Sequence, residues 1–190
     1  MIFLVPILIA AVVVIVFWGG RPKNLFNCTF KHAWLVLVAV CIKAVSIYNL
    51  FGLTEELNSY LRVISLLLVV IFTVVNISYR GVPVVGLGLF LNTLVIAVNG
   101  GNMPINEKYA DMFFSASELV RLREGLPVDS YILSSANTRL SFLGDVISIP
   151  WGGPMLKLFS IGDIIITLGG IVFISFYLRY GCEKEYLKLN

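Results

Sequence analysis

Two aspartates near the C-terminus have the residue type and setting for carboxyl chemistry. Asp145 lies in a short apolar run, and Asp163 opens an apolar stretch long enough to cross a bilayer. A carboxylate at the mouth of a membrane helix is costly to desolvate, so it usually marks a functional site. Two carboxyl groups that share one proton can act as acid and base on a peptide bond. The pair therefore predicts peptide hydrolysis at a membrane surface.

Each aspartate also has a structural interpretation. The sequence Ser160-Ile-Gly-Asp163 matches a capping box, in which the carboxylate satisfies backbone N–H groups at a helix start. Asp145 could satisfy the backbone of a turn. Both follow a glycine, which lets backbone or substrate approach closely. The sequence leaves the catalytic and the structural interpretations open.

The composition indicates an integral membrane protein. Of 190 residues, 58% are hydrophobic and only 13% are charged, about half of the roughly 25% that is usual in soluble domains. Five apolar runs come near the roughly 20 residues that a membrane helix needs. They are residues 2–18, 34–53, 63–79, 82–98 and 160–178. We therefore expect an α-helical membrane protein with five transmembrane helices.

Basic residues predict how the helices are oriented. The first loop holds Arg21, Lys23 and Lys31 without an acid, so we expect it in the cytoplasm, whereas the loop with Glu55 and Glu56 should lie outside. This arrangement places the N-terminus outside and the C-terminus in the cytoplasm of a bacterial inner membrane. It accounts for the net charge of +3 without a nucleic-acid partner.

The same topology divides the chain into three parts. Residues 1–98 hold the first four transmembrane helices, 99–159 an extracytoplasmic cap, and 160–190 the last helix with a cytoplasmic tail. In the cap, residues 106–125 have the pattern of an amphipathic surface helix that starts at Asn106 and stops at Gly125. Residues 128–150 are rich in β-branched and aromatic residues, which predicts a hairpin or cradle of strands turning at 135–138.

Three polar residues are candidates for substrate binding. Asn99, Asn102 and Arg139 lie in the cap segment and could position a peptide. Asparagines are also common at a glycine-rich helix exit, and an arginine could contact lipid headgroups. Lys43 lies mid-helix, where it could pair with a neighbouring helix or stabilise an oxyanion.

The cysteines and the single histidine predict neither a disulfide framework nor a metal. Cys28 and Cys182 fall on the expected cytoplasmic side, Cys41 lies inside a helix, and the cap has no cysteine. His32 stands alone in a loop, so no zinc site and no His-based triad is expected. No organic cofactor is implied.

The C-terminal motif resembles a known membrane peptidase family. The run from Phe159 to Gly170, which reads Phe-Ser-Ile-Gly-Asp-Ile-Ile-Ile-Thr-Leu-Gly-Gly, is similar to the last motif of lipoprotein signal peptidase (signal peptidase II), Phe-Asn-x-Ala-Asp followed by a similar helix. Asp145 stands where that family has its other catalytic aspartate. The resemblance implies an Asp/Asp pair at the outer surface, beneath a β-cradle and a surface helix. Of the family's Gly-Asn-x-x-Asp-Arg motif, only Asn137-Thr-Arg139 remains.

A second resemblance covers more of the chain. The set Asn99-Gly-Gly-Asn-Met-Pro104, Leu143-Gly-Asp145 and Ser160-Ile-Gly-Asp163 resembles a group of small uncharacterised bacterial membrane proteins, which we expect to be nearer relatives.

The residues thus favour an aspartic-type peptidase that cleaves an exported or lipid-modified peptide, such as a lipoprotein precursor, at the outer leaflet. The alternative is a non-enzymatic protein whose cap binds a partner or membrane lipids, with both aspartates structural. A transporter is a third possibility, but broken helices and paired halves are not evident in the sequence.

Overall fold

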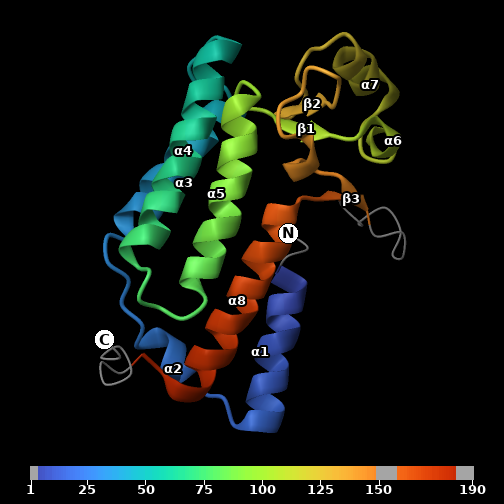
Figure 1. The fold of residues 1–190 in the computed structure, drawn as a ribbon. Helices are drawn as coiled ribbons and strands as arrows, with labels where there is room; N and C mark the ends of the chain where they lie inside the picture. The colour runs from blue at the N-terminus through green and yellow to red at the C-terminus, as the bar shows by residue number, and fades with distance from the viewer. Residues whose placement is uncertain (1–3, 149–157, 183–190) are drawn as a thin grey trace.

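The computed structural model describes residues 4–148 and 158–182, and these are mostly helical with a few short strands (Figure 1). The helices are α1 (Leu4–Trp18), α2 (Lys23–Phe26), α3 (Trp34–Ile47), α4 (Glu55–Val75), α5 (Val82–Val98), α6 (Glu107–Ala110), α7 (Ala116–Arg123) and α8 (Ile161–Tyr180), with a 3-10 turn η1 (Ser141–Leu143). The strands are β1 (Met103–Ile105), β2 (Tyr131–Leu133), β3 (Ile147–Ser148) and β4 (Leu158–Phe159).

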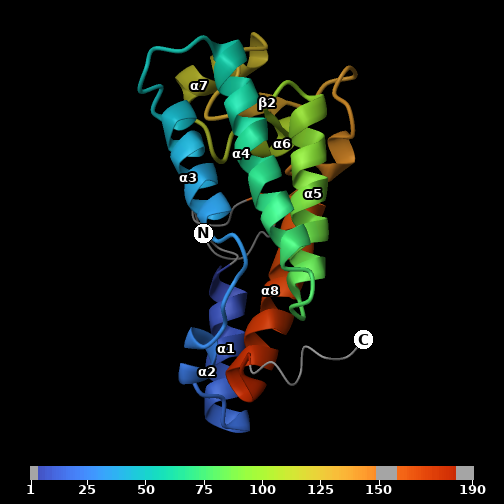
Figure 2. The ribbon, with the colours of Figure 1, turned by 90° about the vertical axis from the view of Figure 1, so that its left-hand side faces the viewer.

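The long helices form two staggered groups. Figures 1 and 2 show α3, α4 and α5 together at the end that carries the cap, and α1, α2 and most of α8 at the other end. The contact between α5 and α8 joins the two groups. Glycines allow this contact to be close, because a Cβ on Gly88 would lie 2.5 Å from the carbonyl oxygen of Gly162.

Two of the helices, α4 and α8, are long and apolar enough to cross a membrane. The other apolar helices, α1, α3 and α5, have 15, 14 and 17 residues. At about 1.5 Å per residue, each falls short of the roughly 30 Å of a hydrocarbon core. The described residues therefore contain two helices of membrane-spanning length, where the sequence pattern predicts five.

Helix boundaries differ from the prediction around α3 and α4. The structure gives α5 its predicted bounds, but α4 starts at Glu55 and not at Val63. Thr54 caps this start by accepting a hydrogen bond from the backbone N–H of Leu57 at 3.4 Å. The expected outer loop is thus the first two turns of a helix. The helix α3 ends at Ile47, before a turn in which Asn49 has a φ of 43°.

The expected hairpin within residues 128–150 is wrong for the described part of that segment. β2 pairs in parallel with β1, which comes directly after α5, and β3 pairs antiparallel with β4. The turn at 135–138 does form, since Thr138 donates its N–H to the carbonyl of Ser135 at 3.1 Å. The chain after it enters η1 and not a returning strand, because β1 already occupies the edge of β2. Residues 149–150 of the predicted hairpin lie outside the described residues.

The expected surface helix is two helices. Asn106 caps α6 and Gly125 follows the end of α7 with a φ of 79°, so both predicted ends are confirmed. Between them Ser115 starts a new helix with a capping box, in which its hydroxyl and the Glu118 carboxylate bind each other's backbone N–H. This second cap is the physical reason for the break.

The expectation of no disulfide is also wrong. Cys28 and Cys182 form a disulfide with their Cα atoms 5.0 Å apart, while Cys41 is free and exposed. The bond attaches the segment after α2 to the end of α8. Asn24 reinforces this attachment by donating its side-chain amide to the carbonyl of Leu178 at 2.8 Å.

Candidate functional site

Asp145 is built into the edge of the small sheet. Its N–H donates to the carbonyl of Pro104 at 2.9 Å, its carbonyl accepts from Asn106, and it bridges Ile105 in parallel. This approach requires Gly144, because a Cβ there would lie 2.5 Å from the Pro104 carbonyl oxygen. The glycine before the aspartate therefore admits a neighbouring strand. The residue Asp145 is only 6% exposed.

The pairing directs the Asp145 side chain toward the helices. Met103 is paired with Tyr131, and Ile105 is flanked by Leu133 and Asp145. In-register neighbours in a sheet share a face, and so do alternate residues of one strand. Met103 packs against Val95 of α5, and Tyr131 and Ile161 of α8 border this cluster. Asp145 and Tyr131 thus belong to the face that covers α5 and the start of α8.

Asp163 lies at the start of α8 in the expected capping box. Its N–H donates to the hydroxyl of Ser160 at 3.0 Å, and its Oδ2 accepts from the N–H of Ser160 at 3.0 Å. Asn92 of α5 adds a third contact by donating to Asp163 Oδ1 at 2.8 Å, while its own Oδ1 accepts from the Ser160 hydroxyl at 2.9 Å. The carboxylate is therefore held by two helices.

Asp145, Asp163 and Tyr131 lie close enough to interact electrostatically. The pKa of Asp145 is raised from 3.8 to about 7, mainly by burial and also by the charge of Asp163, while a hydrogen bond with the Tyr131 hydroxyl acts in the lowering direction. Burial and both carboxylates raise the pKa of Tyr131. Asp145 Oδ1 is buried and has no hydrogen-bond partner within residues 4–148 and 158–182. Asp145 Oδ1 therefore remains available for a hydrogen bond with a substrate or a water molecule.

Sequence reasoning missed Tyr131 in this site, whereas the expectation that Asn92 forms an interhelical hydrogen bond is confirmed by its bond to Asp163. The signal for Asn92 was an amide within an apolar run, which is also typical of ordinary interhelical hydrogen bonding. The sequence pattern did not indicate a functional role for Tyr131, because a tyrosine in a β-rich segment is usually interpreted as a core residue. Its phenol reaches the site only because β2 pairs with β1.

The three predicted substrate residues are placed elsewhere. The Asn99 amide binds the carbonyls of Val95 and Arg139 at 2.8 and 2.7 Å and accepts from the N–H of Arg139 at 3.0 Å. The Asn102 amide donates to Gly100 at 3.0 Å and accepts from Arg62 at 3.0 Å. Both asparagines thus hold the turn after α5 in place. The Arg139 side chain is exposed and forms no ion pair with any described residue.

Lys43 is exposed on α3 and forms no ion pair within the described part of the chain. Neither a partner on a neighbouring helix nor a place at the site is thus found for Lys43 among the described residues. Among the described residues, no group of three His, Cys, Asp or Glu side chains could hold a metal ion.

Fold and site together define the class: a mostly helical, strongly apolar protein with a small cap that covers two interacting carboxyl groups. A family model matches residues 27–175, and the chain belongs to this family of unknown function (DUF5317). An uncharacterized protein of Thermotoga maritima is 25% identical over 165 residues, which cover 84% of this chain and 82% of the relative. No solved structure matches the chain. The expected kinship with an uncharacterised family is confirmed.

Proposed function

We propose that this protein is an intramembrane aspartic-type peptidase in which Asp145 and Asp163 form the catalytic pair. The observation that carries the proposal is the buried Asp145 carboxyl, whose Oδ1 has no partner among the described residues although the charge of Asp163 acts on it. A buried polar atom without a partner costs about 1–3 kcal/mol, so a site that retains one is expected to use it.

In the proposed mechanism the two carboxyls have different tasks. With a pKa of about 7, Asp145 carries a proton in a large fraction of molecules at neutral pH and donates it to the scissile carbonyl oxygen. The Asp163 carboxylate takes a proton from a water, whose oxygen attacks the carbonyl carbon. When the tetrahedral intermediate collapses, Asp163 returns this proton to the leaving amine and Asp145 recovers its own. Apolar surroundings strengthen each of these interactions.

The proposed substrate is an exported or lipid-modified peptide that reaches the site from the membrane. The cap exposes Met112, Val120, Leu126 and Phe142, each at least 49% exposed, which suits contact with acyl chains or a hydrophobic peptide. The exposed Arg139 can bind a carboxylate or phosphate of such a substrate. In this proposal Asn99 and Asn102 do not contact the substrate themselves but hold the turn after α5, next to Arg139, in place.

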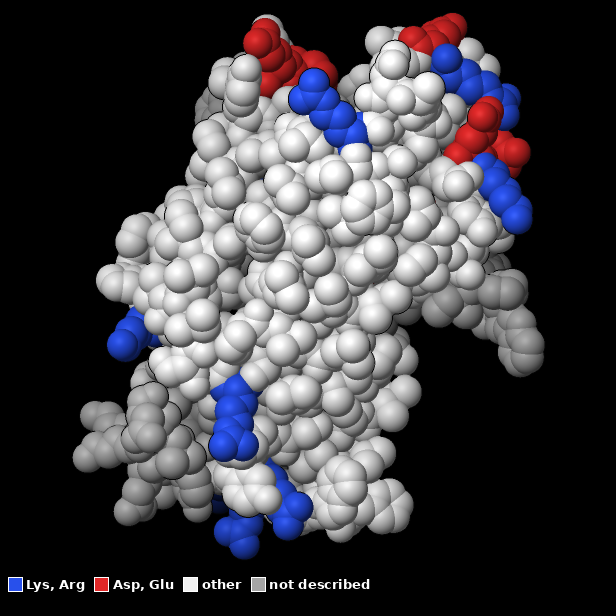
Figure 3. All heavy atoms as spheres, viewed as in Figure 1, with Lys and Arg blue, Asp and Glu red and all other residues white. Residues whose placement is uncertain are grey.

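The proposal includes five membrane-embedded helices with the N-terminus outside and the C-terminus in the cytoplasm. Figure 3 supports two different ends: on this face, acidic side chains gather only at the end that carries the cap, and the other half carries basic side chains alone. The Cys28–Cys182 disulfide then lies on the cytoplasmic side, where thiols are usually reduced. A membrane-impermeant reductant followed by a membrane-impermeant maleimide should therefore leave both cysteines unlabelled in intact cells, because neither reagent reaches the cytoplasm. Labelling from outside would reverse the orientation.

The function is tested by cleavage of a synthetic lipid-modified signal peptide by the purified protein in lipid vesicles. Asp145→Asn and Asp163→Asn should each lower turnover by about 10²–10⁴-fold while helicity and thermal unfolding show a folded protein. Asp111→Asn is the matched control, because Asp111 is an exposed aspartate of the cap that is ion-paired with Arg123. Full turnover in either site variant would reject the catalytic pair.

A second candidate is a non-enzymatic protein whose cap binds membrane lipid or a partner. The observation in its favour is the Asp163 carboxylate, which already accepts hydrogen bonds from Ser160 and Asn92 and so has a structural use. In that case Asp163→Asn should lower thermal stability, and no variant should change a cleavage rate.

A further inference from the structure

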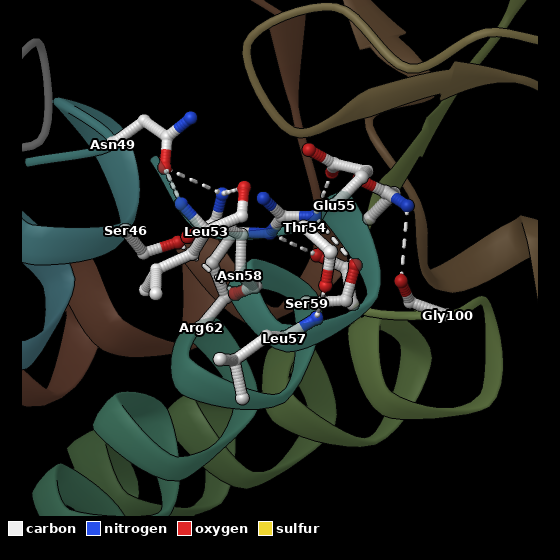
Figure 4. A network of polar contacts seen from close by, with 12 residues as sticks. Ser46, Asn49, Leu53, Thr54, Glu55, Leu57, Asn58, Ser59, Arg62 and Gly100 are labelled. Carbon is white, nitrogen blue, oxygen red and sulfur yellow. Dashed lines mark hydrogen bonds and ion pairs between the residues drawn. The ribbon is translucent and has the colours of Figure 1, made fainter. Parts of the chain in front are cut away.

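A buried arginine in α4 lies at the centre of a second polar network. Arg62 is 9% exposed, although it belongs to a helix with the length and composition of a membrane span. Its guanidinium Nη2 donates to Glu55 at 2.6 Å and to Ser59 at 2.8 Å, both on α4 itself (Figure 4). A buried charge is costly to desolvate, so its contacts should serve a specific purpose.

The remaining contacts of Arg62 reach the turn between α5 and β1. Nε donates to the carbonyl of Gly101 at 2.9 Å, and Nη2 donates to Asn102 Oδ1 at 3.0 Å. This turn lies directly on α4, because a Cβ on Gly101 would be 2.8 Å from the Cα of Ser59. Arg62 therefore fixes the two residues that immediately precede β1.

The strand that starts there carries Asp145. Met103 donates its N–H to Ser130 at 2.8 Å, which aligns β1 with the start of β2. Pro104 then accepts the N–H of Asp145, and Ile105 forms the parallel bridge to it. A shift of the Gly101–Asn102 turn would therefore move the backbone to which Asp145 is attached.

We propose that Arg62 is a positioning residue for the Asp145–Asp163 site, which it serves by holding the turn that sets β1 over the start of α8. The catalytic meaning of this role rests on the proposed function, whereas the positional role does not. An arginine suits it because its planar group presents donors toward several acceptors at once, which an ammonium group reproduces poorly.

The test follows the protonation of Asp145 in the full-length protein in lipid vesicles. Infrared spectroscopy detects the C=O stretch of a protonated carboxyl, and the band of Asp145 is identified by its loss in Asp145→Asn. The titratable groups around this carboxyl are Asp163 on α8 and Tyr131 on β2, with Asp129 close to Tyr131. None of these is altered in the variants compared.

Arg62→Lys should lower the midpoint of the Asp145 band by about one pH unit or more, because a loosened β1 admits water to the carboxyl. Asn102→Ala, which removes one contact of Arg62, should lower it in the same direction by less, and it keeps the test valid if the lysine variant does not fold. Asn58→Ala is the matched control. Asn58 belongs to the same network but contacts Asn49 and Leu53 and not the turn before β1.

An unchanged midpoint in a folded Arg62→Lys or Asn102→Ala variant overturns the inference, as does an equal shift in Asn58→Ala. The two proposals fail separately. A shifted midpoint in a protein without peptidase activity removes the proposed function alone, and an active peptidase with an unchanged midpoint removes the role of Arg62 alone.

Discussion

The buried polar clusters around Arg62 and Asp145 differ in how well the surrounding groups stabilise the charge of the central residue. Around Arg62 the charged group has an acceptor in each contact described for it, including the carboxylate of Glu55. Around Asp145 the charged form is opposed by burial and by a second carboxylate, and one oxygen has no partner within the described residues. The contacts of Arg62 compensate its buried charge, whereas the ionised form of Asp145 carries a free-energy cost in the folded state.

The difference separates residues that hold the fold from residues that could react. An arginine held by several acceptors fixes backbone positions, whereas a buried carboxyl with an unpartnered oxygen can still exchange a proton or accept a new partner. Because β1 connects the two clusters, the cluster around Arg62 supports the one around Asp145.

The buried carboxyl of Asp145 should have the strongest effect on stability of the groups in the two clusters. Its pKa is 3.8 when unfolded and about 7 when folded, so between those values the folded state holds a proton that the unfolded state has lost. The free energy of unfolding should therefore fall as pH rises from about 4 to about 7, by up to about 4 kcal/mol, and stay level above that range.

Asp145→Asn should abolish this dependence and make the protein more stable at neutral pH. Thermal unfolding in detergent at several pH values measures both effects, with Asp111→Asn as the control that should retain the slope. If the stability of Asp145→Asn changes with pH as that of the parent protein does, ionisation of Asp145 does not destabilise the folded state.

Two adjacent glycines test how closely the turn held by Arg62 packs on α4. Gly100 and Gly101 have φ values of 65° and 78°, but an added Cβ meets nothing within 4 Å at Gly100 and meets Ser59 at 2.8 Å at Gly101. Gly100→Ala should cost about 1 kcal/mol for its left-handed backbone. Gly101→Ala should cost about 1–3 kcal/mol more, because it also pushes the turn away from α4. Equal losses in thermal unfolding would mean that the turn does not rest on α4.

The two capping boxes provide a smaller contrast. Ser115→Ala in the cap should cost about 1 kcal/mol, since it removes an exposed helix cap. Ser160→Ala should cost roughly 1 kcal/mol more, because Ser160 is fully buried and also donates to Asn92. Chemical denaturation of the purified variants gives both values, and a larger loss for Ser115→Ala would contradict the proposed packing around Asp163.

The smallest effect is expected at Glu55. This side chain is 56% exposed, so its ion pair with Arg62 is screened by water. Glu55→Gln should lower stability by about 0.5 kcal/mol at low salt and by less at high salt. A decrease of several kcal/mol in the free energy of unfolding that does not depend on salt concentration would show that Glu55 is a buried partner of Arg62.

Much of the helical architecture could be predicted from sequence, because apolar runs and capping residues act locally. The bounds of α5, the cap at Ser160 and the ends at Asn106 and Gly125 all follow from neighbouring residues. The start of α4 was not predicted, although Thr54 followed by two glutamates is also a local helix-start signal. Its first turns carry Glu55, Asn58 and Arg62, which have the composition of a loop until their partners are known.

Contacts between residues that are far apart in the sequence could not be predicted from local patterns. The Cys28–Cys182 bond joins positions separated by 154 residues, and the parallel pairing of β1 with β2 brings Tyr131 to Asp145 across a strand from another part of the cap. Neither contact leaves a local pattern, because each depends on which distant segments meet in the folded chain.

By itself, the sequence determined that the chain is apolar and mostly helical, that Asp163 opens a helix, and that Asp145 and Asp163 are its most informative carboxyls. Only the tertiary structure decided that Asp145 is buried beside Tyr131, that Asn92 holds Asp163, and that Arg62 faces inward. The physical reason is that helix formation depends on residues a few positions apart, whereas burial and charge depend on which surfaces meet in the folded chain.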